Sequence, residues 1–293
     1  MNLILTVLEV VAPVFLLALV GFCWVKAGFE YSVEFVTRLS MTLAVPCLIF
    51  VALMRSEVAP AAIATLSFAS MLAYGALTLI FGIMVAAMKL NRATYLAPLI
   101  FGNTGNLGLP LALFAFGETG LSYAVVIFAI MAVFSFTFGI WLVSGGGSLL
   151  RVIKEPMVGA TLLGGVFLWQ GWHTPVWLTN GLDLIGQMGI PLMLITLGVA
   201  VARLKPGHIG QAVWLSLGRT VLCVAVGVAI GRWFALEPVA FAVLVLQLST
   251  PVAVTSYMLA AKYKADADAV AGLVVVSTVL AVVTIPLTLV FLI

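Results

Sequence analysis

Apolar runs of about 20 residues, separated by short polar connections, repeat from one end of the sequence to the other. A run of that length lets an α-helix cross the hydrocarbon core of a bilayer. The pattern therefore predicts an all-α polytopic membrane protein with ten transmembrane helices. The predicted helices cover residues 4–25, 37–54, 60–88, 93–117, 120–143, 154–171, 176–202, 209–233, 238–262 and 268–292.

The composition of the chain is that of a protein embedded in a lipid bilayer. Hydrophobic residues make up 64% of the chain and charged residues 8%, whereas a soluble domain has roughly 25% charged residues. Ten helices with short connections leave no room for a separate soluble domain. In this setting the net charge of +3 does not indicate a nucleic-acid partner.

The basic residues alternate between the two predicted sides of the membrane. One side carries only Arg55 and Arg232, while Arg219 lies inside the eighth predicted helix. Because lysine and arginine are enriched in cytoplasmic connections, we expect the more basic side in the cytoplasm and both termini outside. Chance clustering of basic residues at helix ends is the alternative. The more basic side carries Lys26, Arg38, Lys89, Arg92, Arg151, Lys154, Arg203, Lys205, Lys262 and Lys264.

Similar residues recur at a nearly constant distance along the chain. Pro46 in the second predicted helix and Pro191 in the seventh are 145 residues apart. Asn103 in the fourth and Ser249 in the ninth are 146 residues apart. Internal repeats of this kind are typical of secondary transporters.

The repeat divides the chain into two five-helix halves. The first half covers residues 1–143 and the second covers 154–293, with a cytoplasmic linker at 144–153. Because each half has an odd number of helices, the two halves have opposite orientations in the membrane. The sequence therefore predicts two inverted repeats.

The fourth and ninth predicted helices are both interrupted near their middles. Glycine and proline disfavour a continuous helix, and backbone freed inside a membrane has no water to bind. Matched interruptions point to a substrate site, although glycines can also serve close helix packing and prolines a simple kink. The residues predicted to bind substrate are Asn103, Thr104, Gly105, Asn106, Gln247, Ser249, Thr250 and Pro251; those predicted to break the helices are Gly108, Pro110 and Pro251.

The interrupted helices suit a small organic anion. The N-terminus of each second half-helix presents unbonded amides and roughly half a positive charge. Asn103 and Asn106 add amide donors, and Gln247 can donate or accept a hydrogen bond. The acids and the two histidines are scattered along the chain, which argues against an enzyme, a metal site or a cofactor.

Short motifs in four predicted helices resemble the auxin efflux carrier family, which includes plant auxin transporters and many bacterial permeases. The resemblance covers nearly the whole chain. The residues that carry it are Asn103, Thr104, Gly108, Leu109 and Pro110 in the fourth helix; Leu43, Ala44, Val45, Pro46 and Phe50 in the second; Gln247, Pro251, Ala261, Lys262 and Tyr263 in the ninth; and Ile285, Pro286, Leu287, Thr288 and Leu289 in the tenth.

The resemblance implies a fold shared with the bile-acid symporters. In that fold, ten helices in two inverted repeats form a scaffold domain and a transport domain, and helices 4 and 9 cross. The short linker at 144–153 is similar to that of bacterial members, so the bacterial inner membrane is the implied location. Bacterial relatives are associated with mono- and dicarboxylates such as malate and malonate.

The chain departs from the family pattern in its acidic residues. Residues 61–88 lack the acid that plant members have in the third helix, and residues 239–261 lack the acid that bile-acid symporters use for sodium. Sodium coupling through that position is therefore unsupported. The coupling ion stays unknown, with a proton favoured over sodium.

Arg219 and a pair of glycines leave alternatives open. A charged residue at the centre of a membrane helix is costly, so Arg219 should face protein or water. It can attract the anion or link the domains; alternatively, it can snorkel to an interface or bind backbone carbonyls. Gly227 and Gly231 form a GxxxG pattern that is typical of helix packing and leaves a homodimer open.

Together these patterns predict a secondary transporter that moves a small organic anion, a mono- or dicarboxylate, by alternating access. The helices interrupted at Asn103 and Thr250 would bind the anion where they cross. An anion channel or a passive uniport pore is the alternative.

Overall fold

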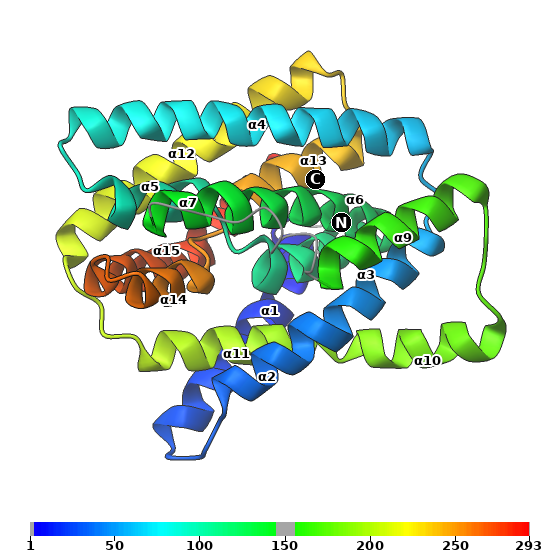
Figure 1. Ribbon diagram of the computed structural model, residues 1–293, viewed down its shortest axis with the longest axis horizontal. Coiled ribbons are helices and arrows are strands. Elements are labelled where there is room, and N and C mark those ends of the chain that lie inside the picture. Colours follow the sequence, from blue (N-terminus) through cyan, green and yellow to red (C-terminus); the bar gives the residue numbers. More distant parts are fainter. Residues whose placement is uncertain (1–2, 145–155, 293) are drawn as a thin grey trace.

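The computed structural model describes residues 3–144 and 156–292, which form helices joined by short connections (Figure 1). Within these residues the only β-type pairing is an isolated antiparallel bridge between Gly102 and Val252. The predicted all-helical class is therefore confirmed. Of the predicted linker at 144–153, all but Ser144 lies outside the described residues, as do Arg151 and Lys154.

The described helices include three short π-helical segments, which carry η labels. In chain order the elements are α1 (Leu3–Lys26), α2 (Val33–Leu39), η1 (Ser40–Ala44), α3 (Val45–Met54), α4 (Pro60–Ala87), α5 (Arg92–Ile100), η2 (Thr104–Gly108), α6 (Leu109–Phe134), η3 (Ser135–Gly139), α7 (Ile140–Ser144), α9 (Pro156–Gln170), α10 (Val176–Gln187), α11 (Gly189–Arg203), α12 (Ile209–Trp233), α13 (Pro238–Ser249), α14 (Val254–Lys262) and α15 (Ala267–Val290).

Among the described residues, seven helical stretches are long and apolar enough to cross a membrane. This number is smaller than the ten predicted because residues 104–144 count as one stretch, whereas 156–170 and 238–249 are shorter apolar helices. The protein is an integral membrane protein, and the ten-span arrangement remains a prediction.

The chain reverses direction at Gly117, inside α6. Gly117 has φ of +63°, a left-handed conformation that favours glycine. A Cβ placed on Gly120 would lie against the carbonyl oxygen of Ala112, although eight residues of straight helix span about 12 Å. Gly105 likewise lies against Phe128. The two arms of this stretch are therefore packed side by side, and the reversal lies where the sequence ends one predicted helix at 117 and begins the next at 120.

The helices associate in two groups. In the first group α1 packs on α11, and α3 packs on α9 and α10. In the second group α12 packs on α4, α13 and α15, while α14 packs on α15 and α4 on α5 and α6 (Figure 1). We call these the α1–α11 group and the α12 group.

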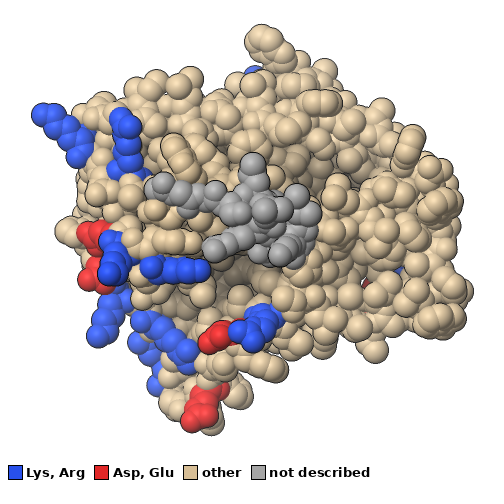
Figure 2. Space-filling view, viewed as in Figure 1, with Lys and Arg blue, Asp and Glu red and all other residues tan. Residues whose placement is uncertain are grey.

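The connections α1–α2, α4–α5, α11–α12 and α14–α15 lie at one end of the molecule, on the left of Figure 1. Figure 2 shows lysine and arginine side chains gathered at this same end. We call it the basic end. The alternation of basic residues predicted from the sequence therefore appears in space as one basic end. Lys89, Lys205 and Lys264 lie in these connections, and Lys26 is the last residue of α1.

Glycines allow the closest helix contacts. Gly21 on α1 and Gly198 on α11 each lie against backbone atoms of the facing helix, which leaves no room for a Cβ. Gly227 and Gly231, the GxxxG pair, pack against Val245 and Phe241 of α13 in the same chain. The GxxxG pattern therefore serves packing within the chain, and a homodimer stays an untested prediction.

We predict that Gly198→Ala lowers the thermal unfolding midpoint of the detergent-purified protein. The added methyl group must push α1 away from α11, and overpacking of this kind costs about 1–3 kcal/mol. Gly75→Ala on α4 is the matched control, because a Cβ there meets nothing within 4 Å. Equal midpoints for the two variants would contradict the close α1–α11 packing.

Candidate functional site

Two helices are interrupted deep inside the molecule. α5 ends at Ile100, the chain is extended at Phe101, and η2 begins at Thr104. α13 ends at Ser249, and α14 begins at Val254. Pro251 has no amide hydrogen and disfavours a helical conformation at Thr250, whose φ and ψ are −55° and 147°. Both helices are therefore interrupted, but the first break lies at residues 101–103. Gly108 and Pro110, which the sequence predicted as its break residues, lie in the helical segments η2 and α6 instead, because proline is accommodated in the first turn of a helix.

The two unwound segments bind each other. The amide of Asn103 donates to the carbonyl of Pro251 at 2.7 Å, and the amide of Ala253 donates to the carbonyl of Phe101 at 3.4 Å. The amide of Val252, which lies between Pro251 and Ala253, donates to the Ser277 hydroxyl on α15 at 3.0 Å. These three amides and the carbonyls of Phe101 and Pro251 are thereby paired inside the protein, as a membrane interior requires. We call this pair of segments, 101–103 and 250–253, the crossover.

Arg219 binds the carbonyl ends of the two first half-helices. Its side chain is buried, with 1% of the residue exposed. Nε donates to the carbonyl of Leu99 in the last turn of α5 at 2.9 Å, and Nη1 donates to the carbonyl of Thr250, which caps α13. A cation at two helix C-termini is favourable because each end carries partial negative charge. The sequence left several roles open for Arg219, and the structure shows that its side chain binds backbone carbonyls.

The two second half-helices begin on the opposite side of the crossover, at a cavity. Asn103 is the N-cap of η2 and Ala253 the N-cap of α14, and both residues line this cavity. The amides of Leu107 and Gly108 donate to the carbonyl of Asn103, so the amides of residues 104–106 precede the first intrahelical bond. Two positive helix ends therefore border one cavity.

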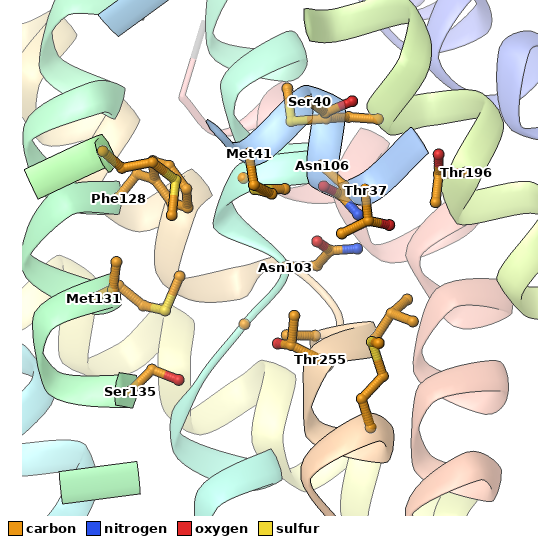
Figure 3. A pocket seen from close by; sticks show the side chains of 18 of the residues that line it. Thr37, Ser40, Met41, Asn103, Asn106, Phe128, Met131, Ser135, Thr196 and Thr255 are labelled. Atoms are coloured by element: carbon orange, nitrogen blue, oxygen red, sulfur yellow. The ribbon is translucent and has the colours of Figure 1, made fainter. Parts of the chain in front are cut away.

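The cavity has a free volume of about 80 Å³, enough for a few waters or one small molecule. Its lining comes from both helix groups. The α1–α11 group contributes α9 and α11, with α2 and η1 packed on this group, and the remaining lining comes from the crossover, η2, α6, η3 and α14. Figure 3 shows Thr37, Asn103 and Asn106 near its middle. Its polar side chains are Thr37, Ser40, Asn103, Asn106, Ser135, Thr196 and Thr255.

The rest of the cavity lining is apolar and rich in flexible methionine side chains. Among the described residues no charged side chain lines it. Phe128 and Met131 lie on the far side from Thr196 in Figure 3. Five of the eleven methionines of the chain line the cavity: Met41, Met131, Met157, Met193 and Met258.

The predicted site residues separate into two sets. Asn103, Gly105 and Asn106 line the cavity. The other set is buried and does not line the cavity: Thr104, Gln247, Ser249 and Thr250. The carbonyl of Pro251 accepts the crossover hydrogen bond from Asn103, and Pro110 lies in the first turn of α6. Gly108 makes room for the Gln247 side chain.

Several buried polar atoms in or beside the crossover have no hydrogen-bond partner in the described part of the chain. They are Nδ2 of Asn103, Oγ1 of Thr104, both side-chain amide atoms of Gln247 and Nη2 of Arg219. Unpaired buried polar atoms are costly, and they mark places where a ligand or ordered water completes a site. Nδ2 of Asn103 belongs to a residue that lines the cavity, so it can donate to a ligand there.

Sequence reasoning missed the contributions of other helices. Thr37 and Thr196 come from α2 and α11, far from either break in the sequence. Thr255 carried a usable signal, because it follows the break in the ninth predicted helix by a few residues and lies in the first turn of the next half-helix. Gly102 was also missed, although its lack of a side chain lets Thr250 and Arg219 approach.

Tyr31 holds the connection α1–α2 against α11 beside the cavity through two hydrogen bonds. The hydroxyl groups of Tyr31 and Thr196 share a hydrogen bond at 2.8 Å, and Arg203 donates to the carbonyl of Tyr31 at 2.8 Å. Burial raises the pKa of Tyr31, against a smaller lowering by the Thr196 bond. The phenol is therefore neutral at physiological pH and adds no charge at this rim.

The acidic residues in the described part of the chain lie away from the crossover. Asp183 on α10 pairs with Arg55 at 3.1 Å beside a second cavity, of about 740 Å³, at the end opposite the basic end. Glu57 and Glu118 line the same cavity. Within the described residues, no group of three or more histidine, cysteine or acidic side chains is placed to hold a metal ion.

Comparison with known proteins adds the family. A family model described as "Membrane transport protein" matches residues 6–149 and 141–289. The chain belongs to this family. The resemblance to auxin efflux carriers is thereby confirmed, and this member of the membrane transport protein family is a transporter rather than an enzyme.

Relatives of this family member come from archaea and a bacterium. It is 28% identical to an "Uncharacterized transporter" of Methanothermobacter thermautotrophicus over 294 residues, 95% of this chain and 96% of the relative. It is 26% identical to an uncharacterized transporter of Methanocaldococcus jannaschii over 200 residues, 64% of each chain. It is 25% identical to a "Putative malonate transporter" of Rhizobium meliloti over 201 residues, 63% of this chain and 62% of the relative.

We predict that Ser277→Ala destabilises the crossover. The change leaves the buried amide of Val252 without an acceptor, which costs about 1–3 kcal/mol. Ser70→Ala is the matched control, because the buried Ser70 hydroxyl only donates to the Leu66 carbonyl of its own helix. Thermal unfolding in detergent measures both, and an equal shift for the two variants would refute the role of Ser277.

Proposed function

We propose that the protein is a secondary transporter that binds a small organic anion, a mono- or dicarboxylate, at the crossover and moves it by alternating access. The observation that carries the proposal is the meeting of two half-helix N-termini, at Asn103 and Ala253, on one cavity. Each N-terminus contributes unbonded amides and partial positive charge. A carboxylate is the simplest small ligand for such a site.

The substrate class follows from the cavity lining and from one relative. Asn103 and Asn106 supply amide donors, and the cavity holds no charged side chain among the described residues. Binding would therefore rest on hydrogen bonds and helix dipoles. The name of the Rhizobium meliloti relative makes malonate the first acid to test.

The proposed architecture is ten transmembrane helices in two inverted five-helix repeats, 1–143 and 154–293. The reversal at Gly117 supports two separate spans within 104–144. α5 followed by η2, and α13 followed by α14, have the same form of a helix, a break and a second helix. In this arrangement the broken helices are the fourth and the ninth.

We place the basic end in the cytoplasm of a bacterial cell, with both termini outside the inner membrane. The reason is the enrichment of lysine and arginine in cytoplasmic connections. The cavity residues Thr37 and Ser40 lie on α2 and η1, which follow the α1–α2 connection at the basic end, and Met157 lies in the first turn of α9. The cavity would then be reached from the cytoplasm in this conformation.

Alternating access requires one group of helices to move against the other. The cavity lies between the α1–α11 group and the α12 group, so a relative movement can open it to either side. Backbone pairing within the crossover keeps the two half-helix N-termini together during such a movement. We therefore assign the scaffold role to the α1–α11 group and the transport role to the α12 group.

The coupling ion is left open, with a proton favoured over sodium. An inside-negative potential favours export of a univalent anion by about 2.3 kcal/mol per 100 mV, so export can proceed without a coupling ion. Import would need a proton, another cation or exchange. No titratable carboxylate or histidine lines the cavity among the described residues, so a coupled proton would have to act elsewhere or travel on the substrate.

We predict that Asn103→Ala lowers affinity for the transported acid about 10-fold to 100-fold. The variant loses a donor to a charged group, worth roughly 1.5–3 kcal/mol. Asn180→Ala, at an exposed position of α10, is the matched control and should bind as the wild type does. Titration calorimetry with folded protein measures the change. Wild-type affinity in the Asn103 variant would contradict the proposal that the anion binds at the crossover.

We predict saturable uptake and counterflow in proteoliposomes for at least one acid of a panel that includes malonate, malate and several monocarboxylates. A carrier must turn its binding site back to the first side of the membrane after each transport cycle, so its flux saturates and shows counterflow. A channel has no such step; its flux does not saturate at low concentration, and it shows no counterflow. Imposed proton, sodium and voltage gradients would identify the driving force. Flux that neither saturates nor shows counterflow would favour the anion channel or passive uniport pore instead.

A further inference from the structure

Arg219 is a buried cation without an anionic partner. It is 1% exposed, and no carboxylate lies within ion-pair distance of it among the described residues. Its two hydrogen bonds go to the neutral carbonyls of Leu99 and Thr250. These C-termini offset the charge on the side of α5 and α13, whereas Nη2, on the side of Gly102, has no hydrogen-bond partner in the described part of the chain.

The backbone of Gly102 lies between this charge and the cavity, with Thr250 beside it. Gly102 lines the cavity, and a Cβ built on it would lie 2.9 Å from Nη2 of Arg219. Nη2 itself has no hydrogen-bond partner in the described part of the chain. The guanidinium therefore lies directly behind the wall that an anion in the cavity would face.

A charge in this position acts strongly on the cavity. The surroundings are buried, and electrostatic interactions are weakly screened where the effective dielectric constant is low. If Arg219 had only a structural role, replacing it would change the binding of charged and neutral ligands to the same extent. An electrostatic arginine distinguishes ligands by their charge.

We propose that Arg219 is the fixed countercharge of the bound anion and determines charge selectivity through the Gly102 backbone, without touching the substrate. This inference rests on the proposed function. It assigns Arg219 two tasks that need the same position: holding the carbonyl ends of α5 and α13, and raising the potential in the cavity. The absence of a side chain at Gly102 is what allows the second task.

The test uses ligands of one shape and different charge. Malonate, malonamate and malonamide carry two, one and no negative charges at neutral pH. Binding of each to the detergent-purified protein is measured by titration calorimetry. Where the wild type prefers another acid, that acid and its primary amide form the series.

We expect Arg219→Gln to weaken binding of the charged ligands about tenfold or more and to leave malonamide within about twofold of the wild type. Arg232→Gln is the matched control, because it removes the same charge at an exposed position of the same helix. It should change none of the affinities. Arg219→Lys keeps the charge and should keep the preference for charged ligands, even where it lowers stability.

Equal losses for charged and neutral ligands in Arg219→Gln would overturn the inference and leave Arg219 a structural role. Where Arg219→Gln yields too little folded protein, Arg219→Lys decides: loss of the charge preference in this variant contradicts the inference. A wild-type protein that binds no organic acid would instead contradict the proposed function. The two failures are therefore distinguishable.

Discussion

The pairing of two unwound backbone segments is the constraint on which the rest of the structure depends. A membrane interior offers no water to backbone groups, so a broken helix needs protein partners. Here each break supplies the partner of the other, through Asn103 with Pro251 and Ala253 with Phe101. The amide between them is bound by Ser277. Neither helix can break alone, and each break fixes the position of the other.

The pairing also sorts the four half-helix ends by charge. The carbonyl ends of α5 and α13 meet on the side of Arg219, which binds one carbonyl from each. The amide ends of η2 and α14 meet at the cavity. One face of the crossover is therefore satisfied by a side chain of the protein, and the other has unbonded donors directed at a space between two groups of helices.

The sequence was a good guide to features that depend on local chemistry. Pro251 marks the second break and Gly117 the reversal, because these residues restrict or free the backbone wherever they occur. The first break lies a few residues before Gly108 and Pro110, to which the sequence assigned it. Alternating basic residues marked one end of the molecule, because each connection carries its own charge. The family was likewise evident from short motifs along the chain, and the family model confirms it.

The composition of the site was harder to predict, because it depends on which helices meet. Thr37, Thr196 and the five methionines reach the cavity from elements that have no special local pattern. Gln247 and Thr104 are next to the breaks and yet are buried behind the cavity wall, because helix rotation decides which side chain faces it. Sequence spacing alone does not determine that rotation near a break.

The most direct test of the account is the location of a transported acid in an electron cryo-microscopy map of the protein at saturating ligand concentration. The account predicts ligand density at the N-termini of η2 and α14, in contact with Asn103 and on the opposite side of the Gly102 backbone from Arg219. Ligand density confined to the cavity beside Arg55 and Asp183, with the crossover cavity empty, would contradict it.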